Sequence, residues 1–134
     1  MTEAEVQEFV TRFAAAWAAR DSEAFLALWH PDGVLRTPFV GRAVAGAELG
    51  KLNDIQNKQA PDLVWQLLDW TWRGDVVVVE WQNSRFVGGK RFDLRGVDKF
   101  RLRDGRIVEE VVYADTAPLR SARSGQILPP LIEI

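Results

Sequence analysis

Apolar residues follow two different periods along this chain of 134 residues. Up to about residue 60 they recur every three or four positions, which is the period of a helix, and from Leu63 onward they fall in dense runs of β-formers that alternate with polar residues. The change of period predicts an α+β protein in which helices come first and an antiparallel sheet follows.

The helical half divides into three expected helices. The first covers residues 3–20, because Thr2 and Glu5 form a capping-box pattern before a regular apolar stripe. A shorter helix begins at Asp21 or Ser22 and ends at the turn-forming residues 30–33, and a short strand then covers residues 34–37. The third helix is expected over residues 44–60, before Pro61 ends it.

Three compact turns divide the second half into four antiparallel strands. Hairpin signals stand at residues 73–75, 87–90 and 103–106, so the expected strands cover residues 63–73, 76–87, 91–103 and 106–115. We assign residues 1–117 to one domain. Residues 118–134 contain three prolines and form a tail without regular structure, and its apolar end is expected to dock on its own domain or on a partner.

Asp98 lies at an apolar position of the expected strand 91–103, on the same face as Phe92, Leu94 and Phe100. If Asp104 and Gly105 form a two-residue loop, Arg103 pairs with Arg106, and the register of each hairpin follows. This register gives an inner sheet face with polar groups among apolar ones, which is typical of a small-molecule pocket: Trp70, Trp72, Trp81, Asn83, Arg85, Asp98, Glu109, Tyr113 and Asp115. The opposite face carries apolar residues that we expect a second copy of the chain to cover in a homodimer: Trp65, Leu67, Val76, Val78, Phe86 and Val97.

Composition excludes several classes of function. The chain has no cysteine and one histidine, so we expect no disulfide and no metal site. A net charge of −2 argues against nucleic-acid binding, and no apolar run is long enough to span a membrane. The acidic N-terminus does not resemble a secretion signal, which favours a cytoplasmic location. Six tryptophans indicate an aromatic core or an aromatic-lined cavity.

Each candidate side chain has a functional and a structural interpretation. Burial would raise the pKa of Asp98 and make it a general acid or base, or Asp98 could be a core carboxylate paired with Tyr113 or Arg85. Tyr113 could donate to an oxyanion, or be a core aromatic residue with its hydroxyl bonded. Asp115 could act in catalysis or cap the segment after it, and His30 could reach the cavity or close the second helix.

The order of several short motifs resembles the SnoaL-like polyketide cyclase group of the nuclear transport factor 2-like superfamily. The motifs are Leu28-Trp29-His30-Pro31-Asp32-Gly33, the segment from Pro38 to Arg42, the run from Asp98 to Glu109, and Tyr113-Ala114-Asp115. The resemblance implies a cone in which three N-terminal helices close a curved sheet around a pocket, which adds Trp17 and Trp29 to the expected lining. It also implies a dimer through the outer sheet face, and a pocket aspartate, Asp98 or Asp115, as acid or base.

The leading hypothesis is a small-molecule enzyme that needs no metal or organic cofactor, with Asp98, Tyr113 and Asp115 as candidate catalytic residues. It would move a proton on an apolar, carbonyl-type substrate, as a cyclase or isomerase does. The alternative is a non-catalytic ligand-binding or assembly module of the same fold. A third possibility is a purely structural dimeric domain.

Overall fold

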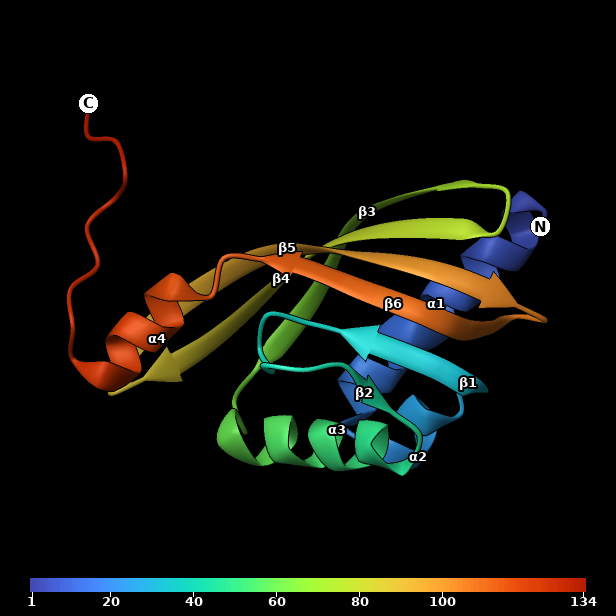
Figure 1. Ribbon diagram of the computed structural model, residues 1–134, viewed down its shortest axis with the longest axis horizontal. Coiled ribbons are helices and arrows are strands. Elements are labelled where there is room, and N and C mark those ends of the chain that lie inside the picture. Colours follow the sequence, from blue (N-terminus) through green and yellow to red (C-terminus); the bar gives the residue numbers. More distant parts are fainter.

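The computed structural model describes residues 1–134 and has the predicted α+β architecture. Six strands form one mixed sheet in the order β2-β1-β6-β5-β4-β3. Helices α1, α2 and α3 lie on one side of this sheet, and α4 lies at its far end (Figure 1). The elements are α1 Glu3–Ala19, α2 Ser22–Leu26, β1 Trp29–Arg36, β2 Val44–Ala45, α3 Ala47–Gln59, β3 Val64–Arg73, β4 Val76–Val87, β5 Lys90–Arg103, β6 Arg106–Ala114 and α4 Ala117–Ser124.

The first helix forms as the sequence predicts. The Thr2 hydroxyl accepts a hydrogen bond from the Glu5 backbone, and the Glu5 side chain accepts one from the Thr2 backbone, so the capping box is complete. The apolar stripe of α1 is fully buried against the sheet, where the rings of Phe9 and Phe13 meet Phe100 of β5 edge to face. The helical stripe therefore places the core directly under the central strands.

The segment between α1 and β3 differs from the prediction. Helix α2 ends at Leu26, and residues from Trp29 to Gly33 belong to strand β1 rather than to a helix and turn. Strand β1 pairs with β6 in parallel and with the two-residue strand β2 in antiparallel orientation. The third helix begins at Ala47 rather than at residue 44, because Gly46 has a positive φ of 62° and cannot continue it backward.

The central hairpin has the predicted register. Val79 pairs with Asp98, and Trp81 pairs with Gly96. The loop between β5 and β6 has the predicted two residues, since Asp104 and Gly105 both have positive φ and Arg103 pairs with Arg106.

A β-bulge in β6 reverses the face that we predicted for most of this strand. The register shifts between Arg101 and Leu102, so that Val108 is the extra residue and Asp98 pairs with Val112 rather than with Val111. Beyond the bulge, Glu110 and Val112 face the core, while Glu109 and Tyr113 lie on the outer face. The predicted inner positions of Glu109 and Tyr113 are therefore wrong.

A second bulge, in β3, has the same kind of effect. The register between β3 and β4 shifts between Leu67 and Asp69, so Leu67 pairs with Trp81 and Trp65 with Asn83. Trp65 and Leu67 thus share the face of Trp81, and their predicted outward orientation is wrong. Trp70 and Trp72, on the hairpin side of the bulge, keep the predicted face.

The last segment contains a helix that the sequence analysis did not anticipate. Pro118 lies in the first turn of α4, where a missing backbone donor costs nothing, and Leu119 packs into the core. Beyond Gly125 the chain leaves the domain and projects away from it (Figure 1). Its apolar residues are exposed, for example Ile127 at 91% and Ile132 at 77%, so this end does not dock on its own domain.

Candidate functional site

A small cavity lies between the sheet and the helices, and Asp98 faces it from the centre of β5. The cavity measures about 50 Å³. Trp81, Asn83 and Arg85 reach it from β4, and Glu110 and Val112 reach it from β6. The remaining lining residues come from the helices, β1, β3 and the connecting segments: Trp17, Phe25, Leu35, Thr37, Phe39, Gln56, Leu63 and Trp65.

Two carboxyl groups share this cavity. Asp98 is 3% exposed and Glu110 is 4% exposed, and the two carboxyl groups are close enough to affect each other's pKa. The indole Nε1 of Trp81 donates a hydrogen bond of 2.9 Å to Oδ1 of Asp98. The Oε2 atom of Glu110 has no hydrogen-bond partner in the protein.

Burial raises the pKa of both carboxyl groups. Loss of hydration raises the pKa of Asp98 to about 7, although the hydrogen bonds from Trp81 and Glu110 counteract part of this effect. Burial and then the negative charge of Asp98 raise the pKa of Glu110 well above its ordinary value. Glu110 therefore ionises less readily while Asp98 is charged, and the two carboxyl groups titrate as a pair.

Gly96 creates the space for the Trp81 ring. The two residues pair across β4 and β5, and a Cβ atom at position 96 would overlap the six-membered ring of Trp81. The glycine lets the ring lie across the neighbouring strand, from where its N–H reaches Asp98.

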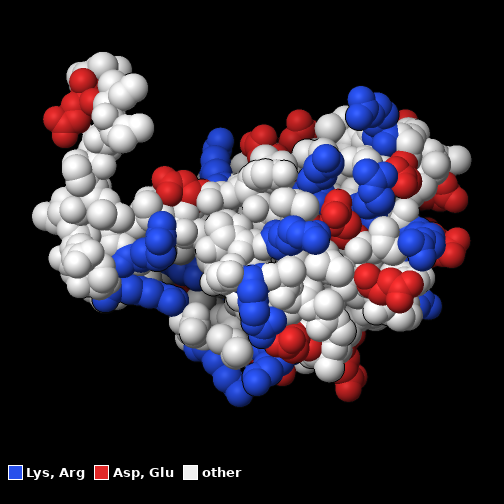
Figure 2. Space-filling view, in the orientation of Figure 1, with Lys and Arg blue, Asp and Glu red and all other residues white.

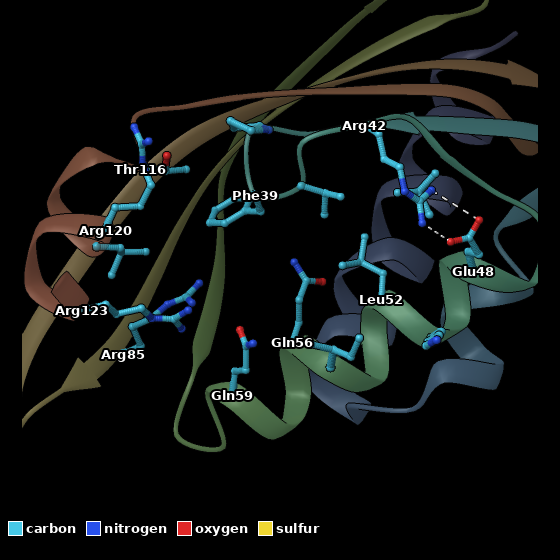
Figure 3. Close-up of a pocket in the computed structure, with 16 residues that line it drawn as sticks. Phe39, Arg42, Glu48, Leu52, Gln56, Gln59, Arg85, Thr116, Arg120 and Arg123 are labelled. Carbon is cyan, nitrogen blue, oxygen red and sulfur yellow. Dashed lines mark hydrogen bonds and ion pairs between the residues drawn. The ribbon is translucent and has the colours of Figure 1, made fainter.

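A larger pocket of about 460 Å³ adjoins the small cavity. Phe39, Gln56 and Arg85 line both spaces, so these three side chains form the wall between them. The larger pocket is bounded by α3, α4, the end of β4 and the segment from Pro38 to Val44 (Figure 3). Its volume lies within the range of ~300–1,000 Å³ that is usual for small-molecule sites.

The structure brings together five of the predicted site residues and leaves the others elsewhere. Those that line the small cavity are Asp98, Trp17, Trp81, Asn83 and Arg85. Three other predicted lining residues reach neither space: Trp29, which is buried against Phe25, and Trp70 and Trp72, which pack against the edge of the core.

The remaining candidates are outside the cavity. Tyr113 is 59% exposed on the outer face, and Glu109 lies 3.4 Å from Arg36 in an ion pair. Asp115 accepts a hydrogen bond from the backbone of Ala117 and so closes the turn that leads into α4. His30 lies in β1, where its Nδ1 atom accepts a hydrogen bond from the backbone of Asp32, so it neither lines the cavity nor closes α2.

Three residues of the cavity are not predicted by the sequence: Glu110, Trp65 and Phe39. The sequence pattern places Glu110 and Trp65 on the outer face because it does not reveal either bulge. Residues 107–112 are an apolar pair, an acidic pair and an apolar pair. This doubled pattern fits either face of the sheet equally well, so the sequence does indicate that the orientation of this strand is undetermined. Phe39 follows Pro38 in a connecting segment, where no periodicity exists to place it.

No group of three or more histidine, cysteine or acidic side chains is close enough together to hold a metal ion. The structure also contains no helix with the length and apolar character needed to cross a membrane.

An α+β fold whose curved sheet and helices enclose a pocket defines a broad class of proteins, and comparison identifies the family. A family model described as the SnoaL-like domain matches residues 10–110, and the chain belongs to this family within the nuclear transport factor 2-like superfamily. The family fold is a small-molecule-binding fold. No match was found among curated proteins.

Several solved structures are similar over nearly the whole chain. AclR, a putative hydroxylase from Streptomyces galilaeus, is 25% identical with a TM-score of 0.78, covering 95% of this chain and 100% of its own. A putative SnoaL-like polyketide cyclase from Jannaschia sp. CCS1 is 26% identical with a TM-score of 0.78, covering 96% and 95%. TerC, crystallised with polyporic acid, shares the fold at 20% identity and a TM-score of 0.76, covering 90% and 98%.

Proposed function

We propose that this protein is an acid–base enzyme that moves a proton next to a carbonyl group of an apolar, cyclic substrate, as a cyclase or isomerase does. The observation that carries the proposal is the Asp98–Glu110 pair, in which two buried carboxyl groups with raised pKa values line the same cavity. A carboxylate whose pKa is raised to about 7 is a stronger base than an ordinary aspartate and is still ionised in much of the population at neutral pH.

In the proposed step, the Asp98 carboxylate removes a proton from the carbon beside the substrate carbonyl. The electrons of the broken C–H bond form an enolate, and its oxygen needs hydrogen-bond donors. Two such donors line the cavity: the Asn83 amide, and the indole Nε1 of Trp17, which is buried without a partner. Asp98 then returns the proton to a different carbon in an isomerisation. In a cyclisation, the enolate carbon instead attacks a second carbonyl, and the alkoxide formed when that C=O π bond breaks takes the proton from Asp98.

Glu110 supports this chemistry as a positioning residue. Burial, and then the charge of Asp98, raise its pKa well above the ordinary value, so in the proposed step it keeps its proton while Asp98 ionises, and its O–H bond orients the Asp98 carboxylate. Relatives named as a putative hydroxylase and a putative polyketide cyclase have similar folds, which is consistent with an enzyme of small organic molecules.

Solvent-deuterium exchange tests the proposal without knowledge of the natural substrate. Cyclic ketones such as 1-tetralone and its carboxylated derivatives are incubated with the protein in D₂O, and loss of the α-proton signal is followed by NMR. We expect wild-type protein to accelerate exchange of at least one compound, and Asp98→Asn to reduce that rate by a factor of ~100 or more. Glu110→Gln should keep most of the activity, because an amide N–H still donates to Asp98.

The outcome that refutes the assignment is an Asp98→Asn variant that is folded and exchanges the same compound as fast as wild type. A rate that rises with pH through an apparent pKa of about 7 would support it further, because the base is then the ionised form of Asp98.

One observation favours the alternative, a ligand-binding module without catalysis. The cavity at Asp98, about 50 Å³, is much smaller than the adjoining pocket of about 460 Å³, so a ligand could occupy only the larger space. This alternative predicts that a bound ketone is recovered without deuterium after long incubation with the protein in D₂O.

A further inference from the structure

The larger pocket has an unbalanced positive charge. Among its lining residues Glu48 is the only acid, and it is already paired with Arg42 at the α3 end of the pocket (Figure 3). The basic lining residues are Arg42, Lys51, Arg85, Arg120 and Arg123. An excess of cations around a concave space raises the local concentration of anions and favours their binding.

Arg85 has hydrogen-bonding capacity that the protein does not use. A guanidinium group has five N–H donors, but the protein accepts only one hydrogen bond from Arg85, of 3.3 Å from Nη2 to Oδ1 of Asn83. Its Nε atom is buried and has no partner. A buried donor without a partner is costly, so this side chain is poised to bind an acceptor that enters the pocket.

Arg123 lies beside Arg85 without a counterion. The guanidinium groups of the two residues are close together at the α4 end of the pocket (Figure 3), and neither forms an ion pair within 4.0 Å. Burial, and then the charge of Arg123, lower the pKa of Arg85. On the protein surface, basic side chains gather over α4 near the base of the tail (Figure 2).

The rest of the pocket is suited to an apolar group. Phe39 and Leu52 lie between the arginine pair and the Arg42–Glu48 ion pair (Figure 3). The Arg85 guanidinium is 6.0 Å from the Phe39 ring centroid, which places charge and apolar surface next to each other. A ligand with an anionic end and an aromatic or alicyclic body would match both parts.

We propose that the larger pocket binds an organic anion, whose carboxylate or phosphate oxygens lie between Arg85 and Arg123 and whose apolar body packs against Phe39 and Leu52. Because Arg85 and Phe39 also line the cavity of Asp98, the bound molecule would be oriented toward that carboxylate. If the bound anion is the substrate of the proposed enzyme, that substrate is an anionic molecule. Only this identification rests on the proposed function; the binding of an anion in the larger pocket does not.

Calorimetric titration with matched probes tests the anion site. The probes are 2-naphthoate, 2-naphthyl phosphate and the neutral 2-naphthamide, which share one aromatic body and differ in the charged group. We expect at least one anion to bind wild-type protein about 10-fold or more tightly than the amide, and to bind less tightly in 500 mM than in 50 mM NaCl. The anion that binds better indicates whether a carboxylate or a phosphate is recognised.

Three substitutions localise the binding. Arg85→Gln and Arg123→Gln should each weaken the anion about 10-fold, whereas Arg106→Gln, in the β5–β6 hairpin at the opposite end of the sheet, should leave its affinity unchanged. Arg123 is exposed, so its variant should fold even if the Arg85 variant does not. Without ligand, the melting temperature of Arg123→Gln should not fall, because the substitution removes a repulsion rather than an attraction.

The inference is overturned if neither anion binds more tightly than the amide, or if Arg106→Gln and Arg123→Gln weaken the anion equally. Asp98→Asn separates this inference from the proposed function, since it should bind the anion as wild type does. Anion binding without deuterium exchange would refute only the acid–base assignment.

Discussion

At the residue scale, the environment of Asp98 rather than its identity determines what it can do. An aspartate in water is ionised at neutral pH and is a weak base. Here the surrounding core raises its pKa to about 7, and Trp81 and Glu110 keep the ionised form accessible by donating hydrogen bonds. The same burial, and then the charge of Asp98, raise the pKa of Glu110 well above its ordinary value, so neither group behaves as a carboxyl group in water does.

The raised pKa values predict an unusual pH dependence of stability. Both groups bind protons more tightly in the folded than in the unfolded state, so their contribution to the free energy of unfolding is greatest at low pH. It should decrease as pH rises from the ordinary carboxyl range through about 7, and further as Glu110 ionises. Where the native state binds one more proton than the unfolded state, the free energy of unfolding falls by about 1.4 kcal/mol for each pH unit of increase.

Urea unfolding at pH 5, 6, 7 and 8 measures this effect when wild type is compared with the Asp98→Asn/Glu110→Gln double variant. The variant cannot ionise at these positions but keeps groups of similar shape. We expect the stability of wild type relative to the variant to decrease steadily as the pH rises. If the free energies of unfolding of wild type and of the double variant change with pH in the same way, the two carboxyl groups titrate normally and their pKa values are not raised.

At the scale of elements, strand pairing determines which residues meet. The sequence was sufficient to predict the four strands after residue 62, the register of β4 against β5 and the two-residue loop at Asp104, because glycines and the apolar alternation mark them. It was not sufficient for the bulges in β3 and β6. A bulge costs little locally and is selected by how the whole sheet packs, so Glu110 could not be distinguished from Glu109 by pattern alone.

The contact between Gly96 and Trp81 gives a prediction about this pairing. Gly96→Ala would push a methyl group into the Trp81 ring, so the ring must move and its hydrogen bond to Asp98 is lost. We expect a loss of ~1–3 kcal/mol in the free energy of unfolding, which is typical of overpacking a core, and a higher pKa for Asp98. Denaturant unfolding and the pH dependence of deuterium exchange measure the two effects.

Gly41→Ala is the matched control for this substitution. A Cβ atom at position 41 would have no heavy atom within 4 Å, apart from chain neighbours, and the backbone there does not have positive φ. Its stability should stay within about 0.5 kcal/mol of wild type. If both alanine variants lose the same stability, the close approach of Gly96 and Trp81 is not the cause.

At the scale of the whole molecule, two surfaces carry apolar residues that have no partner within the chain. One is the outer face of the sheet, where Val78, Val97 and Tyr113 lie on adjacent strands and Tyr113 is 59% exposed. The other is the tail after Gly125, which projects from the domain (Figure 1). Both surfaces could bury apolar area in an assembly, and the sequence alone predicted a dimer through the sheet.

A pair of charge substitutions distinguishes the two surfaces. Val97→Glu places a carboxylate at the centre of the outer sheet face, between Glu80 and Tyr113 in the register, whereas Ile127→Glu places one on the tail. We expect wild type and Ile127→Glu to sediment as dimers at micromolar concentration and Val97→Glu to sediment as a monomer, because an unpaired charge is costly to bury in an interface. A dimer that is lost only with Ile127→Glu would assign the interface to the tail, and a wild-type monomer would contradict the predicted dimer itself.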